Sequence, residues 1–137
     1  MKTMTQKYKI LVIDDDAEVM NTLTNLIKLE ILGSQVEARC CPLKGLETLK
    51  ISHYDLVITD QKMPKLRGTE LLNLADKVLT SYTPFIIYTG SSELINPIEI
   101  TSKHFYAIVE KPRHSELVKA IKRIKLETIL VGKLNRG

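Results

Sequence analysis

Short apolar runs alternate along the chain with segments in which apolar residues recur every three or four positions. An unbroken apolar run is typical of a strand buried on both faces, whereas the recurring spacing is typical of an amphipathic helix. The expected strands lie at residues 8–13, 35–40, 55–59, 84–89 and 107–109. The expected helices begin near Asp16, Pro42, Gly68, Ser91 and Ser115. The pattern therefore predicts strand and helix in alternation, five times over.

Apolar strands joined by helical crossovers indicate an α/β fold with one parallel sheet covered on both faces. We expect a single domain over residues 1–137, with a core at about 8–126 and a C-terminal tail at about 130–137. The second strand is more polar and is expected at an edge. The fourth helix is expected to be short, late-starting or bent, because proline does not fit a helix interior whereas Asn96-Pro97 suits a helix start.

Composition excludes several classes of protein. Hydrophobic residues make up 44% and charged residues 26% of the chain, which argues against disorder. No apolar run could span a membrane and the polar N-terminus does not resemble a signal peptide, so we expect a cytoplasmic protein. Cys40 and Cys41 are expected as free thiols, because a bridge between neighbours is strained. Much of the net charge of +4 lies near the C-terminus, and we interpret it as a solvated helix face rather than a nucleic-acid site.

Polar residues with chemical potential follow four of the five expected strands. Residues 14–16 are three aspartates, Asp60 ends the third strand, Thr89-Gly90 ends the fourth, and residues 110–112 (Glu-Lys-Pro) end the fifth. In open parallel sheets the functional groups lie beyond the carboxyl ends of the strands. Acids, a hydroxyl and an ammonium group are therefore expected at one rim of the sheet.

Together these groups suggest phosphoryl chemistry. Crowded carboxylates repel one another and need a divalent cation, and oxygen ligands without cysteine or histidine favour Mg²⁺. A lysine supplies a point charge for phosphate, while Thr89 and the small Gly90 can approach a phosphoryl oxygen closely. We interpret the set as a carboxylate nucleophile, Asp60, which receives a phosphoryl group whose charge is stabilised by a metal and Lys111.

Each of these residues has a simpler explanation when it is taken alone. The acids at 14–16 could complement a helix dipole, as we expect for Asp16, and Asp60 could be a turn residue. Thr89-Gly90 carries no signal by itself, and Lys111-Pro112 is a common loop pair. The agreement of four separate strand ends favours a functional site.

The order of the motifs adds a further indication. The chain carries ILVIDDD (10–16), YDLVITDQKMP (54–64), Gly68, PFIIYTG (84–90) and EKP (110–112). This ordered set resembles the receiver domain of two-component response regulators, the family of the chemotaxis protein CheY, over about residues 8–126. Thr89 and Lys111 follow Asp60 by 29 and 51 residues, as in that family. The resemblance implies a flavodoxin-like (βα)5 three-layer sandwich whose five-stranded parallel sheet has the order 2-1-3-4-5.

The resemblance also implies a role for each acid. Asp60 would accept a phosphoryl group from a phosphohistidine on a sensor histidine kinase or a histidine phosphotransfer protein. Asp14 and Asp15 would form an acidic pair at the metal site. Asp15 and Asp60 would bind Mg²⁺ directly, with the main-chain carbonyl of Lys62 as a third protein ligand.

The switch residues implied by the resemblance are partly unusual. Thr89 would be the hydroxyl that turns toward the phosphoryl group, and Lys111 would pair with that group. Most relatives carry an aromatic residue three positions before the lysine, where this chain has Ile108. Tyr106 lies two residues earlier and is expected on the same strand face as Ile108. Like Pro97, Ile108 lies on the face through which relatives usually dimerise or bind targets.

We therefore expect a stand-alone, phosphorylatable receiver domain that switches or relays a signal through a protein target or a homodimer. It would be an enzyme only in catalysing its own phosphorylation and dephosphorylation, and we expect no DNA-binding domain in this chain. Three alternatives stay open: a phosphorylation-independent binding module of this fold, the receiver part of a longer regulator, and a Mg²⁺-dependent phosphohydrolase. The last class usually has a second acid two residues after the nucleophile, where this chain has Lys62.

Overall fold

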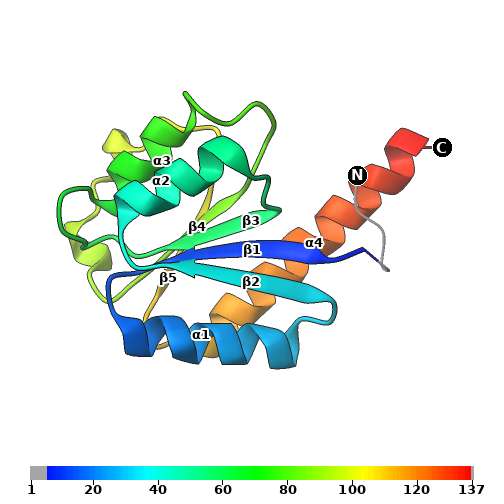
Figure 1. Ribbon diagram of the computed structural model, residues 1–137, viewed down its shortest axis with the longest axis horizontal. Coiled ribbons are helices and arrows are strands. Elements are labelled where there is room, and N and C mark those ends of the chain that lie inside the picture. Colours follow the sequence, from blue (N-terminus) through cyan, green and yellow to red (C-terminus); the bar gives the residue numbers. More distant parts are fainter. Residues whose placement is uncertain (1–5, 137) are drawn as a thin grey trace.

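A five-stranded parallel sheet with the order β2-β1-β3-β4-β5 forms the centre of the protein (Figure 1). The computed structural model describes residues 6–136. The strands are β1 (Tyr8–Ile13), β2 (Ser34–Arg39), β3 (Leu56–Thr59), β4 (Phe85–Thr89) and β5 (Phe105–Glu110). The α-helices are α1 (Ala17–Glu30), α2 (Pro42–Ile51), α3 (Gly68–Ala75) and α4 (His114–Arg136), and two 3₁₀ turns are η1 (Ser92–Leu94) and η2 (Pro97–Glu99). The predicted strand order and the polar edge strand are confirmed.

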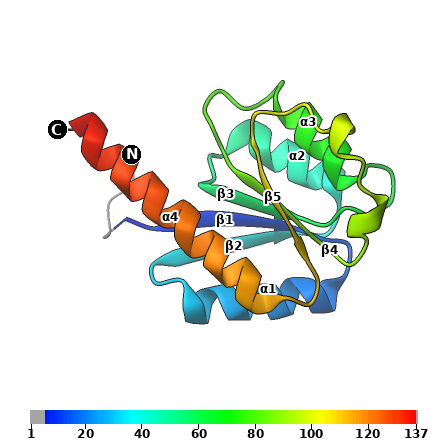
Figure 2. The ribbon, with the colours of Figure 1, turned by 180° about the vertical axis from the view of Figure 1, so that it is seen from behind.

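Helices cover both faces of the sheet, which confirms the three-layer sandwich (Figures 1 and 2). α1 and α4 pack on one face through buried residues such as Leu23, Ile27 and Leu117. α2 and α3 pack on the other face through residues such as Leu49 and Leu71. Because apolar side chains are covered on both sides of the sheet, the central strands contain hardly any polar residue until they end.

Local sequence signals determine where the first two helices begin. The side chain of Asp16 accepts hydrogen bonds from the backbone N–H groups of Glu18 (2.9 Å) and Val19 (3.3 Å), so Asp16 caps α1. Pro42 occupies the first turn of α2, where the N–H that proline lacks would have no partner in the helix. Both features agree with the sequence analysis.

The prediction of a fourth α-helix between β4 and β5 is wrong, so the described chain has four α-helices instead of five. Only the two 3₁₀ turns form there. Asn96 does cap the second turn by accepting a hydrogen bond from the N–H two residues later (3.1 Å), and Pro97 takes its first position. The amide of Asn73 in α3 donates to the carbonyl of Glu99 (2.7 Å), which fixes the end of this turn against α3. The anchored segment then passes through a turn at residues 103–104 into β5.

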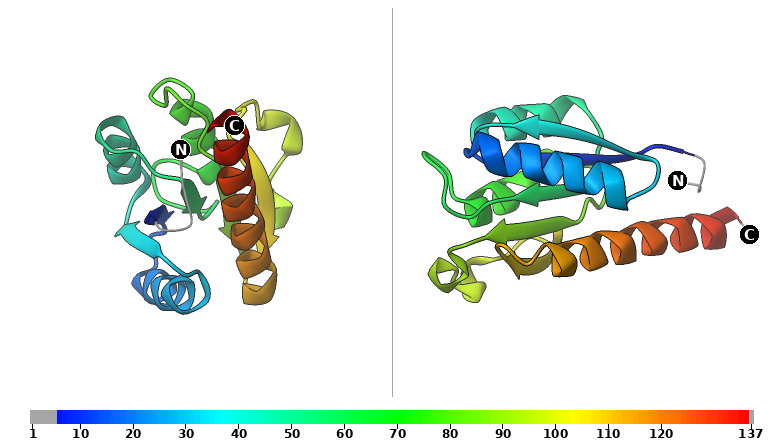
Figure 3. Two further views of the ribbon diagram at one scale, coloured as in Figure 1. Left: turned by 90° about the vertical axis from the view of Figure 1, so that its right-hand side faces the viewer. Right: turned by 90° about the horizontal axis from the view of Figure 1, so that it is seen from below.

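The last helix is longer than the sequence pattern indicated. α4 starts at His114, one residue before the expected cap Ser115, and runs for 23 residues. Residues 130–136, which we expected as a tail, continue the helix, and its final turns project past the sheet (Figures 1 and 3). None of the helices in the described part of the chain, α4 included, is both long and apolar enough to cross a membrane.

β5 departs from regular alternation at Tyr106. Phe85 pairs with Phe105, but the next residue of β4 pairs with Ala107, so Tyr106 is the extra residue of a β-bulge. Its ring consequently packs on the face covered by α1 and α4, whereas Ile108 packs on the opposite face. The expectation that Tyr106 and Ile108 share a strand face is therefore wrong.

His104 is a buried histidine whose charge state is linked to stability. Its side chain is 0% exposed, its Nδ1 accepts a hydrogen bond from the N–H of Thr83 (3.1 Å), and its Nε2 lies 3.4 Å from Oδ1 of Asp76. Burial lowers the pKa of His104, although the charge of Asp76 opposes the shift. As the pH falls through about 6.5, the ordinary pKa of histidine, the unfolded chain takes up a proton before the folded chain does, so the folded state loses stability.

We expect the free energy of unfolding in urea to decrease between about pH 8 and about pH 5.5. The variant His104→Gln keeps an acceptor for the Thr83 N–H but does not titrate. Its free energy of unfolding should therefore decrease less over the same pH range. An equal decrease in the two proteins would show that His104 does not cause the pH dependence.

Candidate functional site

The carboxyl ends of β1, β3 and β5 bring charged residues to one rim of the sheet. Asp14 and Asp15 follow β1, Asp60 follows β3, and Lys111 follows β5. The ammonium group of Lys111 connects the ends of β1 and β3. Its Nζ donates hydrogen bonds to Oδ2 of Asp14 (2.8 Å) and to Oδ2 of Asp60 (3.1 Å). Residues that are far apart in the sequence thus form one cluster.

Asp60 is held firmly at the end of β3. Its backbone N–H donates to the carbonyl of Ile13 (3.1 Å), so the residue stays attached to the sheet after the strand has ended. Its Oδ1 accepts a hydrogen bond from the N–H of Gln61 (2.7 Å), and its side chain is 13% exposed. The carboxylate is therefore fixed in orientation and still accessible from solvent.

Lys111 and Asp14 form the most buried ion pair of this cluster. The Asp14 side chain is 2% exposed and the Lys111 side chain 20%. Burial raises the pKa of Asp14, because its contacts with Lys111 and with the N–H of Asp16 do not fully replace the lost hydration. Burial acts to lower the pKa of Lys111, but the hydrogen bonds and charges of Asp14 and Asp60 outweigh it, so that this pKa is raised. Lys111 is therefore a fixed positive charge at neutral pH.

The donor set at the rim fits a magnesium ion. One carboxylate oxygen from each of Asp14, Asp15 and Asp60 lies within 4.8 Å of the other two. Three negative charges against the one positive charge of Lys111 leave a formal charge of −2, which a divalent cation would cancel. All donors are hard oxygens and Asp15 is exposed, which suits an ion that keeps several of its waters.

The other candidate residues have different surroundings. Thr89 is fully buried at the end of β4, and its Oγ1 accepts a hydrogen bond from the N–H of Ser91 (3.1 Å). Ile108 is half-buried and packs on the sheet face covered by α2 and α3. Lys62 is exposed in the loop after Asp60 and borders a cavity of about 250 Å³. The roles of Thr89 and Ile108 as switch residues, and of the Lys62 carbonyl as a metal ligand, stay predictions.

Gln61 supports the site, although the sequence analysis did not select it. Its side chain is buried, and its Nε2 donates to Oγ1 of Thr69 (3.2 Å) while its Oε1 accepts from the N–H of Thr69 (2.9 Å). Its carbonyl accepts a hydrogen bond from the N–H of Gly68 (2.9 Å). These bonds tie the start of α3 to the residue after Asp60. A glutamine in a loop gives no sequence signal for this role, which becomes visible only through its burial.

Tyr88 of β4 is a second residue that the sequence analysis missed. Nζ of Lys111 lies 6.0 Å from the centroid of the Tyr88 ring, and the Tyr88 hydroxyl lies 2.8 Å from Nδ1 of His114. A cation over the face of an aromatic ring is attracted to it, so Tyr88 restrains the ammonium group that binds Asp14 and Asp60. In the sequence Tyr88 belongs to an apolar run and is indistinguishable from a core residue.

Comparisons with known proteins identify the family. The sequence model described as the response regulator receiver domain matches residues 10–122. A CpxR homolog of Haemophilus influenzae, a transcriptional regulatory protein, is 39% identical over 90 residues, which are 66% of this chain and 37% of that protein. The cell cycle transcriptional regulator CtrA of Caulobacter vibrioides is 28% identical over 108 residues, which are 79% of this chain and 46% of that protein. The chain thus spans less than half the length of these curated relatives.

Solved structures agree with this result. A response regulator receiver domain protein from Clostridium thermocellum is 32% identical, with a TM-score of 0.74 over 92% of this chain and 97% of that chain. A CheY-like receiver domain protein from Methanospirillum hungatei is 28% identical, with a TM-score of 0.79 over 92% and 98%. Each of these likenesses covers 92% of this chain. The chain therefore belongs to the response regulator receiver domain family.

Proposed function

We propose that the protein is phosphorylated on Asp60 by a sensor histidine kinase or a histidine phosphotransfer protein, and that it switches or relays a signal in response. The observation that carries this proposal is the position of Lys111, whose Nζ lies 3.1 Å from Oδ2 of Asp60 and 2.8 Å from Oδ2 of Asp14. A fixed positive charge therefore stands beside the Asp60 carboxylate, which is still accessible from solvent. A reaction that adds negative charge to Asp60 is the one that gains most from that neighbour.

In the proposed reaction a carboxylate oxygen of Asp60 attacks the phosphorus atom of a phosphohistidine. An O–P bond forms while the N–P bond breaks, and the electron pair of the N–P bond stays on the imidazole, which takes a proton from water. Lys111 pairs with the oxygens of the transferred group, and the Thr89 hydroxyl turns toward them. Attack by water on the phosphorus atom later restores Asp60 and releases inorganic phosphate. The protein thus acts on its own side chain and is not a conventional enzyme.

Asp14, Asp15 and Asp60 would hold Mg²⁺, with the main-chain carbonyl of Lys62 as a further ligand. When bound, the ion supplies positive charge that offsets the charge of the phosphoryl oxygens. The formal charge of −2 at the rim repels an incoming phosphate, so phosphoryl uptake should require the ion. We expect phosphoryl transfer to Asp60 to take place in the cytoplasm. This compartment is reducing, which suits the free thiols of Cys40 and Cys41.

Phosphorylation would act by shifting an existing equilibrium between two conformations of the face around β5. The output would pass through a downstream protein target or a second copy of the chain. One observation favours a second candidate, a phosphorylation-independent binding module: the two 3₁₀ turns η1 and η2 stand between β4 and β5, where we expected a helix. A partner that binds equally well with and without a phosphoryl mimic would favour the module over the switch.

A direct test is incubation with acetyl phosphate and Mg²⁺, followed by measurement of the intact mass. We expect one adduct of about 80 Da, the mass of a phosphoryl group. The same incubation with excess EDTA should give no adduct, because the carboxylates then stay uncompensated. An unchanged mass in the presence of Mg²⁺, or an adduct that forms equally well in EDTA, would contradict the proposal.

A further inference from the structure

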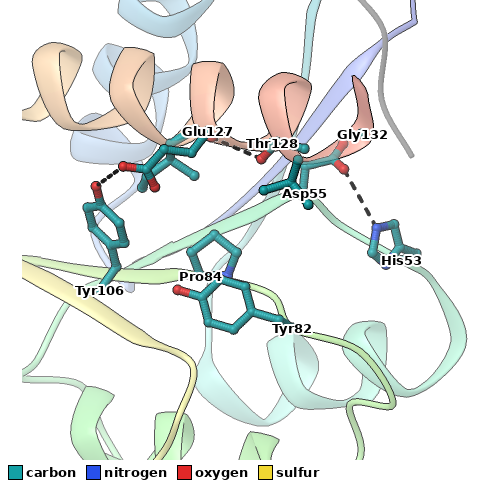
Figure 4. Close-up of a pocket in the computed structure, with 10 residues that line it drawn as sticks. His53, Asp55, Tyr82, Pro84, Tyr106, Glu127, Thr128 and Gly132 are labelled. Carbon is teal, nitrogen blue, oxygen red and sulfur yellow. Dashed lines mark hydrogen bonds and ion pairs between the residues drawn. The ribbon is translucent and has the colours of Figure 1, made fainter. Parts of the chain in front are cut away.

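A cavity of about 540 Å³ lies between the second half of α4 and the loops that lead into β3 and β4 (Figure 4). Its volume lies in the range of small-molecule sites. His53 and Asp55 contribute from the entry to β3, and Tyr82 and Pro84 from the entry to β4. These are the amino ends of the parallel strands, whereas Asp60 and Lys111 lie at the carboxyl ends. The cavity is therefore separate from the phosphorylation site.

The β-bulge of β5 provides one wall of this cavity. Because Tyr106 is the extra residue of the bulge, its side chain is directed to the α4 side of the sheet. There its hydroxyl donates a hydrogen bond to Oε1 of Glu127 (3.3 Å), and the pair closes one side of the cavity while Tyr82 lies opposite (Figure 4). Two aromatic rings and an apolar proline thus stand beside a carboxylate.

The cavity is acidic although the whole chain is basic. Among the described residues that line it, Asp55 and Glu127 are acids and none is a lysine or arginine, while the chain as a whole carries +4. The pKa values of Tyr82 and Tyr106 are both raised. Burial is the larger cause, and the negative charge of Glu127 is the second. Arg123, which does not line the cavity, offsets only part of this effect at Tyr106.

The Asp55 carboxylate already has protein partners. Its Oδ2 accepts a hydrogen bond from the N–H of Lys9 (2.8 Å), and its Oδ1 lies 3.6 Å from Nε2 of His53. Asp55 therefore adds negative charge to the lining of the cavity. Glu127 is exposed on α4 and accepts a hydrogen bond from the neutral Tyr106 hydroxyl. A ligand's cationic group would therefore pair with Glu127.

We propose that this cavity binds a small organic cation with a flat apolar body, such as an aromatic amidine or amine. The apolar body would lie between the rings of Tyr82 and Tyr106, which attract cations through their faces, and the charged group would pair with Glu127. The ligand would connect α4 to the strand entries and so restrain the helical turns that project past the sheet. This proposal does not depend on phosphorylation of Asp60.

Benzamidine is a suitable probe, because neutral benzamide has nearly the same shape without the charge. Backbone amide shifts of the full chain, recorded without Mg²⁺ or phosphodonor, should move saturably with benzamidine at Gly132, the glycine that lines the cavity. We expect benzamide to bind at least about tenfold more weakly, the factor that corresponds to the loss of one charge-assisted contact.

Two variants and a matched control complete the test. Glu127→Gln should weaken benzamidine binding about five- to tenfold, and Tyr82→Leu should weaken it through loss of the ring. Glu116→Gln removes the same charge from an exposed position on the same helix, outside the cavity, and should leave the affinity unchanged. Equal binding of benzamide and benzamidine, an unaffected Glu127→Gln variant, or no saturable shift at Gly132 would each overturn the proposal. In each variant, unchanged amide shifts far from the substituted residue would show that the protein is folded.

Discussion

Replacement of Asp60 by asparagine is expected to abolish phosphoryl uptake from acetyl phosphate in the presence of Mg²⁺. The amide of asparagine is a very weak nucleophile, and the substitution also removes one of the three carboxylates that would hold the metal. Folding should survive, because asparagine has nearly the same shape and Lys111 keeps its 2.8 Å hydrogen bond to Asp14. The measurement is the intact mass after incubation, which should equal the mass of the untreated variant.

The matched control is Asp16→Asn. This exchange also turns an aspartate near the rim into an amide, but Asp16 serves as the cap of α1, and asparagine caps helices about as well. The control should therefore form the adduct of about 80 Da like the parent protein. Uptake that is equal in the Asp60→Asn variant and the parent would remove Asp60 from its proposed role, and loss of uptake in both variants would show that the effect is not specific to Asp60.

The second large effect is expected at Gly68, where alanine should destabilise the protein by about 3 kcal/mol. A Cβ atom at this position would lie 2.2 Å from the carbonyl oxygen of Asp60 and 3.1 Å from Cα of Gln61. Both atoms belong to the backbone, so no flexible side chain can move aside. The α3 start would have to shift away from the loop that positions Asp60, with loss of the Gly68–Gln61 hydrogen bond.

Urea unfolding of the Gly68→Ala variant measures this cost, and Gly90→Ala is its control. A Cβ atom at Gly90 would meet nothing within 4 Å, so the free energy of unfolding should change by less than about 0.5 kcal/mol. Equal stability of the Gly68→Ala variant and the parent would show that the loop after β3 adapts easily, contrary to the close approach seen in the structure.

The parts of the fold that the sequence predicts are those controlled by apolar periodicity. The parallel sheet and its two covered faces follow from unbroken apolar strands and helical crossovers, whereas the strand order is implied by the resemblance to receiver domains. The convergence of Asp14, Asp60 and Lys111 follows from the rule that the carboxyl ends of parallel strands share one rim. Neither the covered parallel sheet nor the convergence of these three residues requires knowledge of contacts between particular side chains.

The parts that escaped prediction depend on single tertiary contacts. The segment between β4 and β5 contains a proper helix start at Asn96-Pro97, yet the hydrogen bond from Asn73 to the Glu99 carbonyl limits it to one 3₁₀ turn. The bulge at Tyr106 reverses the face that strict alternation gives to that residue. Gly68 was recognised as part of a motif, but its physical reason, the approach to the Asp60 carbonyl, is visible only in three dimensions.

The central claim is that Asp60 itself receives the phosphoryl group, and borohydride mapping of the adduct tests it most directly. Borohydride reduces an acyl phosphate to an alcohol, which converts a phosphorylated aspartate into homoserine and marks its position in the peptide. After treatment with acetyl phosphate and Mg²⁺, we predict homoserine at position 60. Homoserine at position 14 or 15, or an adduct that borohydride does not reduce, would contradict the claim.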